Sequence, residues 1–161
     1  MKSINIGLLS AMPEEIGHTI DNLENVTLKV YGDLKIYYGK LKKKVPNYES
    51  VYITLAWSGW GKVSAARAIT RILAGTNKID LIIFTGVAGA ANKNLSQWDI
   101  VIANEVIQHD MDARPIFEKF VLPPLKKAKL ESDNFLKNWI FNSLTKSFKN
   151  GGLTGFGRIK K

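Results

Sequence analysis

A short apolar run that ends in a glycine-rich turn constrains the fold more than any other part of this sequence. Residues 79–84 are almost continuously apolar, which is typical of a strand that a parallel sheet buries on both faces. The turn that follows, residues 85–90, contains Gly86 and Gly89. Because ligands of open α/β sheets bind just beyond the carboxyl ends of the strands, this turn is a candidate binding site.

Two other apolar segments run into loops of similar character. Residues 4–9 lead into a loop that carries the neighbouring carboxylates Glu14 and Glu15, and residues 51–57 lead into the glycine-containing segment 58–62. Parallel strands end at a common edge of their sheet, so we expect these three junctions to lie together. A carboxylate above glycine-rich turns is suited to the activation of a water molecule.

The rest of the sequence predicts alternating helices and strands with one inserted hairpin. A helix should begin at Pro13, with Ile16, Ile20 and Leu23 on its apolar face. The other expected elements are a hairpin of strands 26–31 and 34–41, a helix from residue 62 to about 74 with an apolar stripe at Val63, Ala66, Ile69 and Leu73, a strand over 99–107, and a helix over 133–144. This order predicts an α/β fold, a three-layer sandwich around a mixed, mainly parallel sheet.

Composition narrows the class of protein. With 161 residues and a hydrophobic fraction of 45%, we expect one domain over residues 1–161. The chain has no cysteine, no signal-peptide core and no apolar run of membrane-spanning length, which favours a cytoplasmic protein without a membrane partner. The net charge of +9 comes from lysine runs that are typical of solvated loops, and no nucleic-acid-binding motif accompanies them. We therefore expect no nucleic-acid partner.

Familiar ligand motifs do not fit. The glycines of residues 86–89 lack dinucleotide-binding spacing, and residues 58–63 lack the glycine and hydroxyl positions of a P-loop. The segment His109–Asp112 has only His18 as a second histidine, so a structural hydrogen bond is favoured over zinc, and we expect neither a metal nor a cofactor. Glu14 and Glu15 fall in the first turn of a predicted helix, where acidic residues also occur for purely structural reasons.

Five segments, taken together, resemble one enzyme family. They are residues 6–16, 58–66, 85–89, 99–101 and 109–112. Their order resembles that of the methylthioadenosine/S-adenosylhomocysteine nucleosidases, members of the purine nucleoside phosphorylase superfamily. The resemblance implies a fold of nucleoside phosphorylase/nucleosidase type. It also implies a homodimer that hydrolyses the N-glycosidic bond of methylthioadenosine or S-adenosylhomocysteine, giving adenine and a thioribose product in methionine salvage.

The resemblance also assigns site residues. Glu15 aligns with the glutamate that activates water, and we expect it to face the turn at residues 86–89. The positions that the resemblance places against the adenine nucleoside are Met12, Trp60, Val87, Ala88, Gly89, Ala113 and Ile116. Trp60 stands where the family usually has a smaller aliphatic residue, so the pocket for the alkylthio group should be narrower and should favour the methylthio substrate.

The sequence departs from the family pattern near its end. The resemblance places an aspartate that protonates the purine, and a glutamate that holds the ribose, in the second half of the family's chain. Residues 134–161 contain no Asp and no Glu, so we expect a C-terminally truncated domain. Two interpretations remain open: a nucleosidase whose activity depends on Glu15, or a catalytically incompetent remnant that acts as a nucleoside-binding or dimerisation module.

Overall fold

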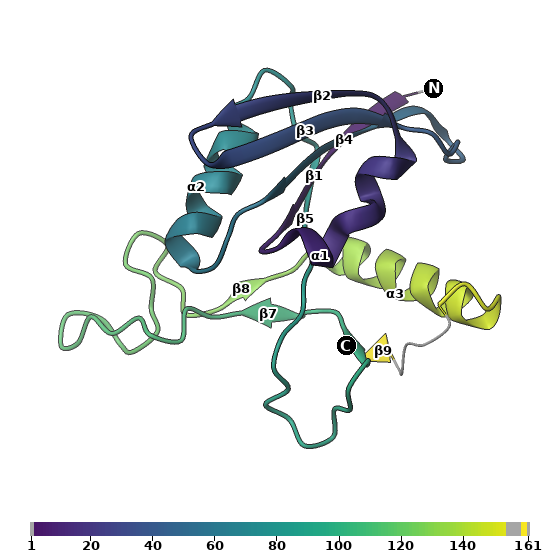
Figure 1. The fold of residues 1–161 in the computed structure, drawn as a ribbon. Coiled ribbons are helices and arrows are strands. Elements are labelled where there is room, and N and C mark those ends of the chain that lie inside the picture. The colour runs from purple at the N-terminus through teal and green to yellow at the C-terminus, as the bar shows by residue number, and fades with distance from the viewer. Residues whose placement is uncertain (1, 154–158, 161) are drawn as a thin grey trace. The chain divides into compact units, whose positions relative to one another are not determined.

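The computed structural model describes residues 2–153 and 159–160, and the chain divides between Gly89 and Ala90 into two units. The first unit contains a mixed sheet with helices on both faces (Figure 1). Its elements are β1 (Lys2–Ser10), α1 (Pro13–Ile16), the 3-10 helix η1 (Gly17–Asn22), β2 (Leu23–Tyr31), β3 (Leu34–Leu41), β4 (Tyr48–Trp57), α2 (Lys62–Leu73) and β5 (Leu81–Phe84).

The sheet of the first unit has the strand order β2-β3-β4-β1-β5. Strand β1 pairs in parallel with both β4 and β5, whereas β3 pairs antiparallel with both β2 and β4. The predicted mixed sheet and inserted hairpin are therefore confirmed. The sheet is not mainly parallel, which differs from the prediction. It has two parallel and two antiparallel strand pairs, because the hairpin of β2 and β3 joins the same sheet.

Three strands end together at one edge of this sheet, as the sequence predicts. At the end of β1, Leu9 lies opposite Phe84 of β5, and Ser10 lies opposite Trp57 of β4. Backbone bonds continue past the strand ends, from the Thr85 N–H to the Leu9 carbonyl at 3.0 Å and from the Ser58 N–H to the Ser10 carbonyl at 2.8 Å. The loops after β1, β4 and β5 consequently start side by side.

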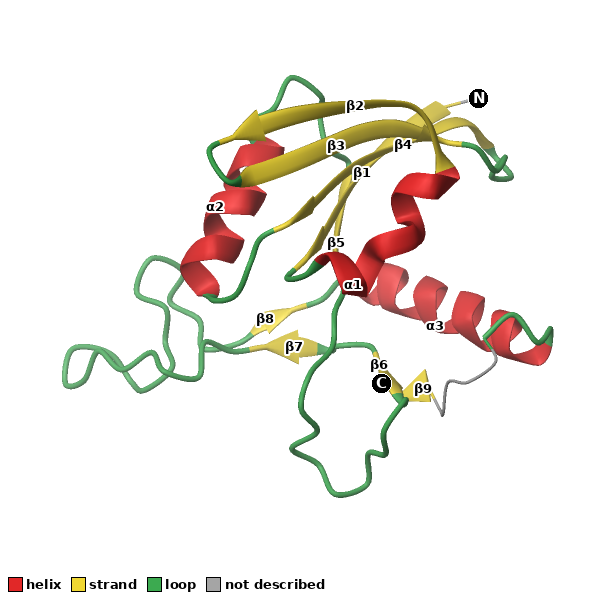
Figure 2. Ribbon diagram, in the orientation of Figure 1, coloured by secondary structure: helices red, strands yellow, loops and turns green. Residues whose placement is uncertain are grey.

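The core lies on both faces of the sheet, as the near-continuous apolar sequence of β1 requires. Between the sheet and α2, the buried residues are Leu9, Leu34, Ile36 and Ala56 of the strands and Ala68 and Ile72 of the helix. The residues buried on the face covered by α1 and η1 are Ile16, Leu23, Val51, Ile53 and Leu55. Figure 2 shows these helices on opposite sides of the strands, which is the expected three-layer arrangement.

The first predicted helix is much shorter than its apolar spacing suggests. Only residues 13–16 are α-helical, residues 17–22 form η1, and Leu23 already begins β2. The helix cannot continue because the Asn22 carbonyl accepts the Lys42 backbone N–H at 3.0 Å, which extends the pairing of β2 with β3. The apolar residues at helical spacing nevertheless face the core, since Ile16 and Leu23 are buried and Ile20 packs, partly buried, against them.

Helix α2 has the predicted bounds, but only part of the predicted stripe faces the core: Ile69 packs against it, whereas Ala66 is exposed. Val63 and Leu73, expected on the apolar stripe, are 85% and 55% exposed, whereas Ala68 and Ile72 are buried. The reason lies in the sheet beneath the helix. A Cβ at Gly7 of β1 would stand 2.5 Å from Ile82 Cδ1 and 3.3 Å from Ile72 Cγ2, so the bare backbone of this strand leaves room for both side chains.

The second unit is richer in loops. Its described elements are β6 (Ile100–Val101), β7 (Glu105–Val106), β8 (Leu130–Glu131), α3 (Asn134–Lys149) and β9 (Ile159–Lys160). The strand expected over residues 99–107 is two short strands, of which β6 pairs with β9 and β7 with β8. Helix α3 is confirmed, and it begins where the Asp133 carboxylate accepts the Leu136 N–H at 2.8 Å.

No helix within residues 2–153 is both long enough and apolar enough to cross a lipid bilayer.

Candidate active site

The loop after β1 folds back on itself around Met12. The buried Ser10 hydroxyl donates to the Met12 carbonyl at 2.9 Å, and the Glu15 backbone N–H donates to the same oxygen at 3.2 Å. These two bonds form a tight turn between the strand and the short helix α1. The turn brings the Glu15 side chain back over the end of β1.

Three backbone N–H groups hold the Glu15 carboxylate. Its Oε2 accepts the N–H groups of Ala11 at 2.8 Å and of Met12 at 2.9 Å. Its Oε1 accepts the Val87 N–H at 2.9 Å, across the strand edge. The carboxylate therefore joins the loop after β1 to the turn after β5, and Glu15 faces the turn at residues 86–89 as expected.

These contacts lower the pKa of Glu15. The Val87 N–H has the largest effect, and the Met12 and Ala11 N–H groups add to it, whereas partial burial acts in the opposite direction. A position in the first turn of a helix also lowers the pKa of an acid, but α1 has only four residues, and here the three N–H groups are the cause. At neutral pH Glu15 is ionised and able to accept a proton.

Gly86 provides the space for this carboxylate. A Cβ at residue 86 would lie 2.7 Å from Glu15 Oε1 and 3.1 Å from its carboxyl carbon. The backbone of the turn after β5 can approach Glu15 only because residue 86 has no side chain. The sequence indicates a close approach at this turn, and the partner at Gly86 is Glu15.

Trp60 lies in the neighbouring loop, which is fixed to the loop after β1. The Ser58 N–H bonds to the Ser10 carbonyl, and the Gly59 N–H donates to the Ala11 carbonyl at 3.0 Å. The Trp60 side chain is 78% exposed. Its flanking glycines have φ of 76° and 93°, so the conformation of this loop itself favours glycine on both sides of the indole.

The other predicted contacts of the first unit lie in the turn after β5. Val87 gives its N–H to Glu15, while its side chain is 79% exposed. Ala88 and Gly89 follow and are also exposed. Of the predicted contacts, Met12 and Val87 thus each bind the Glu15 carboxylate through a backbone N–H group.

Ala113 and Ile116 belong to the second unit. The Ala113 carbonyl accepts the N–H groups of Ile116 and Phe117, each at 3.1 Å, and the Ile116 side chain is 81% exposed. Beside them, the Arg114 guanidinium donates to Asp112 at 2.9 and 2.5 Å. This pairing holds the pKa of Asp112 at about 2.

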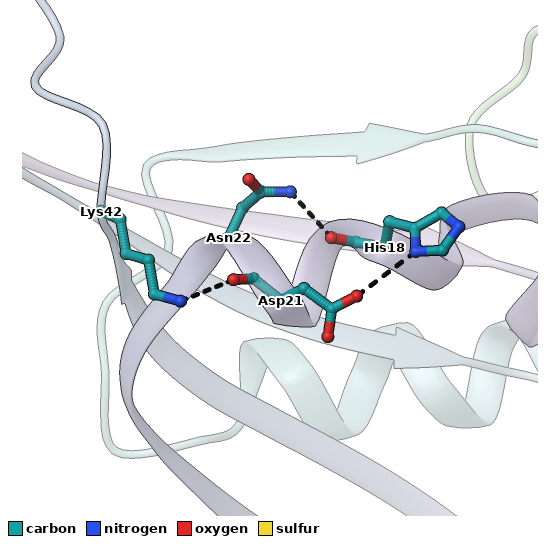
Figure 3. A network of polar contacts seen from close by, with 4 residues as sticks. All are labelled: His18, Asp21, Asn22 and Lys42. Atoms are coloured by element: carbon teal, nitrogen blue, oxygen red, sulfur yellow. Dashed lines mark hydrogen bonds and ion pairs between the residues drawn. The ribbon is translucent and has the colours of Figure 1, made fainter.

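The histidine His18 belongs to a surface network (Figure 3). Its Nδ1 lies 3.3 Å from Asp21 Oδ2, and both side chains are largely exposed. Asn22 donates to the His18 carbonyl at 2.8 Å, and Lys42 donates to the Asp21 carbonyl at 2.7 Å, so the network ties η1 to the end of β3. Within the described part of the chain, no three His, Cys, Asp or Glu side chains form a group that could hold a metal ion.

Comparison with known proteins places this arrangement in a family. The family model described as "Phosphorylase superfamily" matches residues 5–147, which include both the Glu15 loop and the turn after β5. The chain belongs to the phosphorylase superfamily. The predicted nucleosidase resemblance is supported by the most similar proteins found.

Two curated relatives in this superfamily carry the name 5'-methylthioadenosine/S-adenosylhomocysteine nucleosidase. The one from Staphylococcus haemolyticus is 37% identical over 131 residues, covering 81% of this chain and 54% of its own length. The one from Staphylococcus saprophyticus is 34% identical over the same coverage. This superfamily member therefore spans about half the length of the curated relatives it matches.

Solved structures of the superfamily share its fold. The Neisseria meningitidis nucleosidase in complex with methylthio-immucillin-A has a TM-score of 0.78 at 29% identity, covering 97% of this chain and 62% of its own. The Streptococcus pyogenes S-adenosylhomocysteine nucleosidase in complex with 5-methylthiotubericidin has a TM-score of 0.77 at 26% identity, covering 99% and 62%. The predicted nucleosidase-type α/β fold is confirmed.

Sequence reasoning overlooked several groups that build the site. The Ala11 N–H has no sequence signature because it is a main-chain group. The Ser10 hydroxyl has none because serine is a common residue at the end of a strand. Gly86 was part of a recognised turn, but a glycine pattern does not reveal which side chain occupies the space it leaves.

Proposed function

We propose that this chain carries the water-activating part of a nucleosidase that hydrolyses the N-glycosidic bond of methylthioadenosine and S-adenosylhomocysteine, with adenine as a product. The observation that supports it most is the Glu15 carboxylate, which three backbone N–H groups fix above the turn at Gly86. The names of the relatives support the substrate class.

The chemistry of the reaction suits such a group. Cleavage of a glycosidic bond passes through a sugar with oxocarbenium character, so a nearby carboxylate both offsets positive charge and deprotonates the attacking water. A carboxylate with a lowered pKa stays ionised under the conditions of the reaction. Its fixed orientation reduces the cost of aligning water with the sugar carbon.

The remaining contacts belong to the same proposal. Met12 and Trp60 would flank the ribose and its alkylthio substituent, while Val87, Ala88 and Gly89 would pass the ribose and base. Ala113 and Ile116 would form a further wall. By the same resemblance we expect a cytoplasmic homodimer that acts in methionine salvage and needs no cofactor, with an adenine nucleoside as its small-molecule ligand.

The whole reaction also needs a proton for the departing purine. Loss of such a transfer typically costs about 10²–10⁴ in rate. The family resemblance assigns this acid to the second half of the family's chain, and this sequence covers 54% and 62% of the lengths of two relatives. The proposal therefore gives Glu15 one half of the acid–base chemistry.

Adenine release from methylthioadenosine tests the proposal. The decisive variant is Glu15→Gln, and the matched control is Glu14→Gln, which neutralises the adjacent exposed carboxylate. We expect turnover that Glu15→Gln abolishes and Glu14→Gln preserves. Turnover that is equal in both variants would remove Glu15 from the chemistry.

The second candidate is a nucleoside-binding or dimerisation module without turnover. Equilibrium binding of methylthioadenosine without adenine release would support it, and light scattering would report the dimer.

A further inference from the structure

We propose that Ser10 is a positioning residue whose hydroxyl fixes the loop that holds the Glu15 carboxylate in place. The inference rests on the proposed function only for its link to catalysis. In the structure, the buried Ser10 hydroxyl orients the Ala11 and Met12 N–H groups that bind Glu15.

Ser10 occupies the last position of β1 and is completely buried. Its hydroxyl donates to the Met12 carbonyl at 2.9 Å. Its own carbonyl accepts the Ser58 N–H at 2.8 Å, so the residue is anchored to the end of β4. A hydroxyl in this place extends the rigid edge of the sheet into the first turn of the loop.

Met12 connects this hydroxyl to the carboxylate. The Met12 carbonyl accepts the Ser10 hydroxyl and the Glu15 backbone N–H, and the Met12 N–H donates to Glu15 Oε2 at 2.9 Å. The two peptide groups on either side of the Met12 Cα are therefore held by Ser10 and Glu15. If the carbonyl lost its hydroxyl partner, the turn could rotate and its N–H donors would move relative to the carboxylate.

A purely structural role predicts a different outcome. A buried serine also contributes by filling space and by satisfying its own hydroxyl, and either contribution would change stability without reaching Glu15. Two substitutions separate the possibilities. Ser10→Cys keeps the residue small but replaces a strong donor by a weak S–H, whereas Ser10→Thr keeps the hydroxyl and adds a methyl group to a full site.

The experiment measures the Glu15 pKa by ¹³C NMR titration, with the resonance assigned through Glu15→Gln, and melting temperature in parallel. For Ser10→Cys we expect the pKa to rise toward its ordinary value of 4.5. For Ser10→Thr we expect a lower melting temperature with the wild-type pKa. The matched control is Ser58→Ala. Ser58 is also buried, and its hydroxyl donates to the Gly59 carbonyl at 2.7 Å and more weakly to the Ser10 carbonyl at 3.4 Å, so the control removes a hydroxyl beside Ser10 but keeps the bond to the Met12 carbonyl.

A Glu15 pKa that is unchanged in Ser10→Cys, or that rises equally in Ser58→Ala, would overturn the inference. In the adenine-release assay, displacement of the Glu15 carboxylate in Ser10→Cys should lower kcat with little change in KM. Ser10→Thr, which keeps the hydroxyl, should retain kcat. Should Glu15→Gln leave adenine release intact while Ser10→Cys still raises the pKa, the proposed function fails and the positioning role of Ser10 stands.

Discussion

Replacement of Gly86 by alanine tests the fit between the Glu15 carboxylate and the turn after β5. The new Cβ would lie 2.7 Å from Oε1, and ordinary contact begins at 3.4 Å, so the oxygen must move by about 0.7 Å. Movement directly away from the turn would lengthen the 2.9 Å bond from the Val87 N–H to about 3.6 Å, beyond hydrogen-bonding distance.

The expected cost is the weakening of one hydrogen bond to the Glu15 carboxylate. A hydrogen bond to a charged group contributes about 1.5–3 kcal/mol, and partial exposure of Glu15 favours the lower end. Gly86 does not have a positive φ, so alanine meets no backbone strain there. Because the Val87 N–H is the largest cause of the lowered Glu15 pKa, we expect Gly86→Ala to raise that pKa and, for the same reason, to lower the melting temperature at neutral pH but not in strong acid.

The assay is an NMR titration of Glu15 in Gly86→Ala, with Gly89→Ala as the matched control. A Cβ at Gly89 would meet no atom within 4 Å, so the control adds the same methyl group in the same turn without contact. A displacement approaching 1 Å can also cost about 10² in rate, which adenine release would measure. An unchanged Glu15 pKa in Gly86→Ala, or an equal rise in Gly89→Ala, would refute the packing argument.

Three further predictions concern stability and charge. Ile72→Ala should lower the free energy of unfolding by about 2–5 kcal/mol, whereas Val63→Ala should change it by less than about 0.5 kcal/mol; equal effects in urea titrations would contradict the assignment of the buried face of α2. Because the folded-state pKa of Glu15 lies below its ordinary 4.5, its ionisation stabilises the fold above that pH, and this stabilisation is lost as the pH falls through the folded-state pKa. Glu15→Gln should therefore destabilise the protein at neutral pH but not in strong acid, and a pH-independent difference in the unfolding free energy would rule this out. Arg114→Ala should raise the pKa of Asp112 from about 2 toward 3.8, and an NMR titration that shows no rise would argue against the ion pair.

Much of the first unit could be predicted because its sequence signals are local. The near-continuous apolar run of β1, the two-residue turn between β2 and β3, and the glycine before α2 each determine one element without reference to the rest. Since parallel strands share an edge, these elements also predicted that the Glu15 loop and the turn at Gly86 meet.

The errors arose where distant contacts decide the structure. The first helix stops because the backbone N–H of Lys42, twenty residues later, donates to the Asn22 carbonyl. The buried face of α2 depends on its packing against the sheet, where Gly7 leaves room for Ile72, and no periodicity within the helix can reveal such contacts. Likewise, a main-chain donor such as the Ala11 N–H belongs to every residue type except proline, so the donors to Glu15 leave no mark on the sequence.

The main-chain character of these donors changes how the site responds to mutation. Exchange of the side chains at positions 11, 12 and 87 leaves their N–H groups in place, and only proline would delete one outright. Evolution can thus vary the side chains at these three positions while the main chain continues to hold the Glu15 carboxylate.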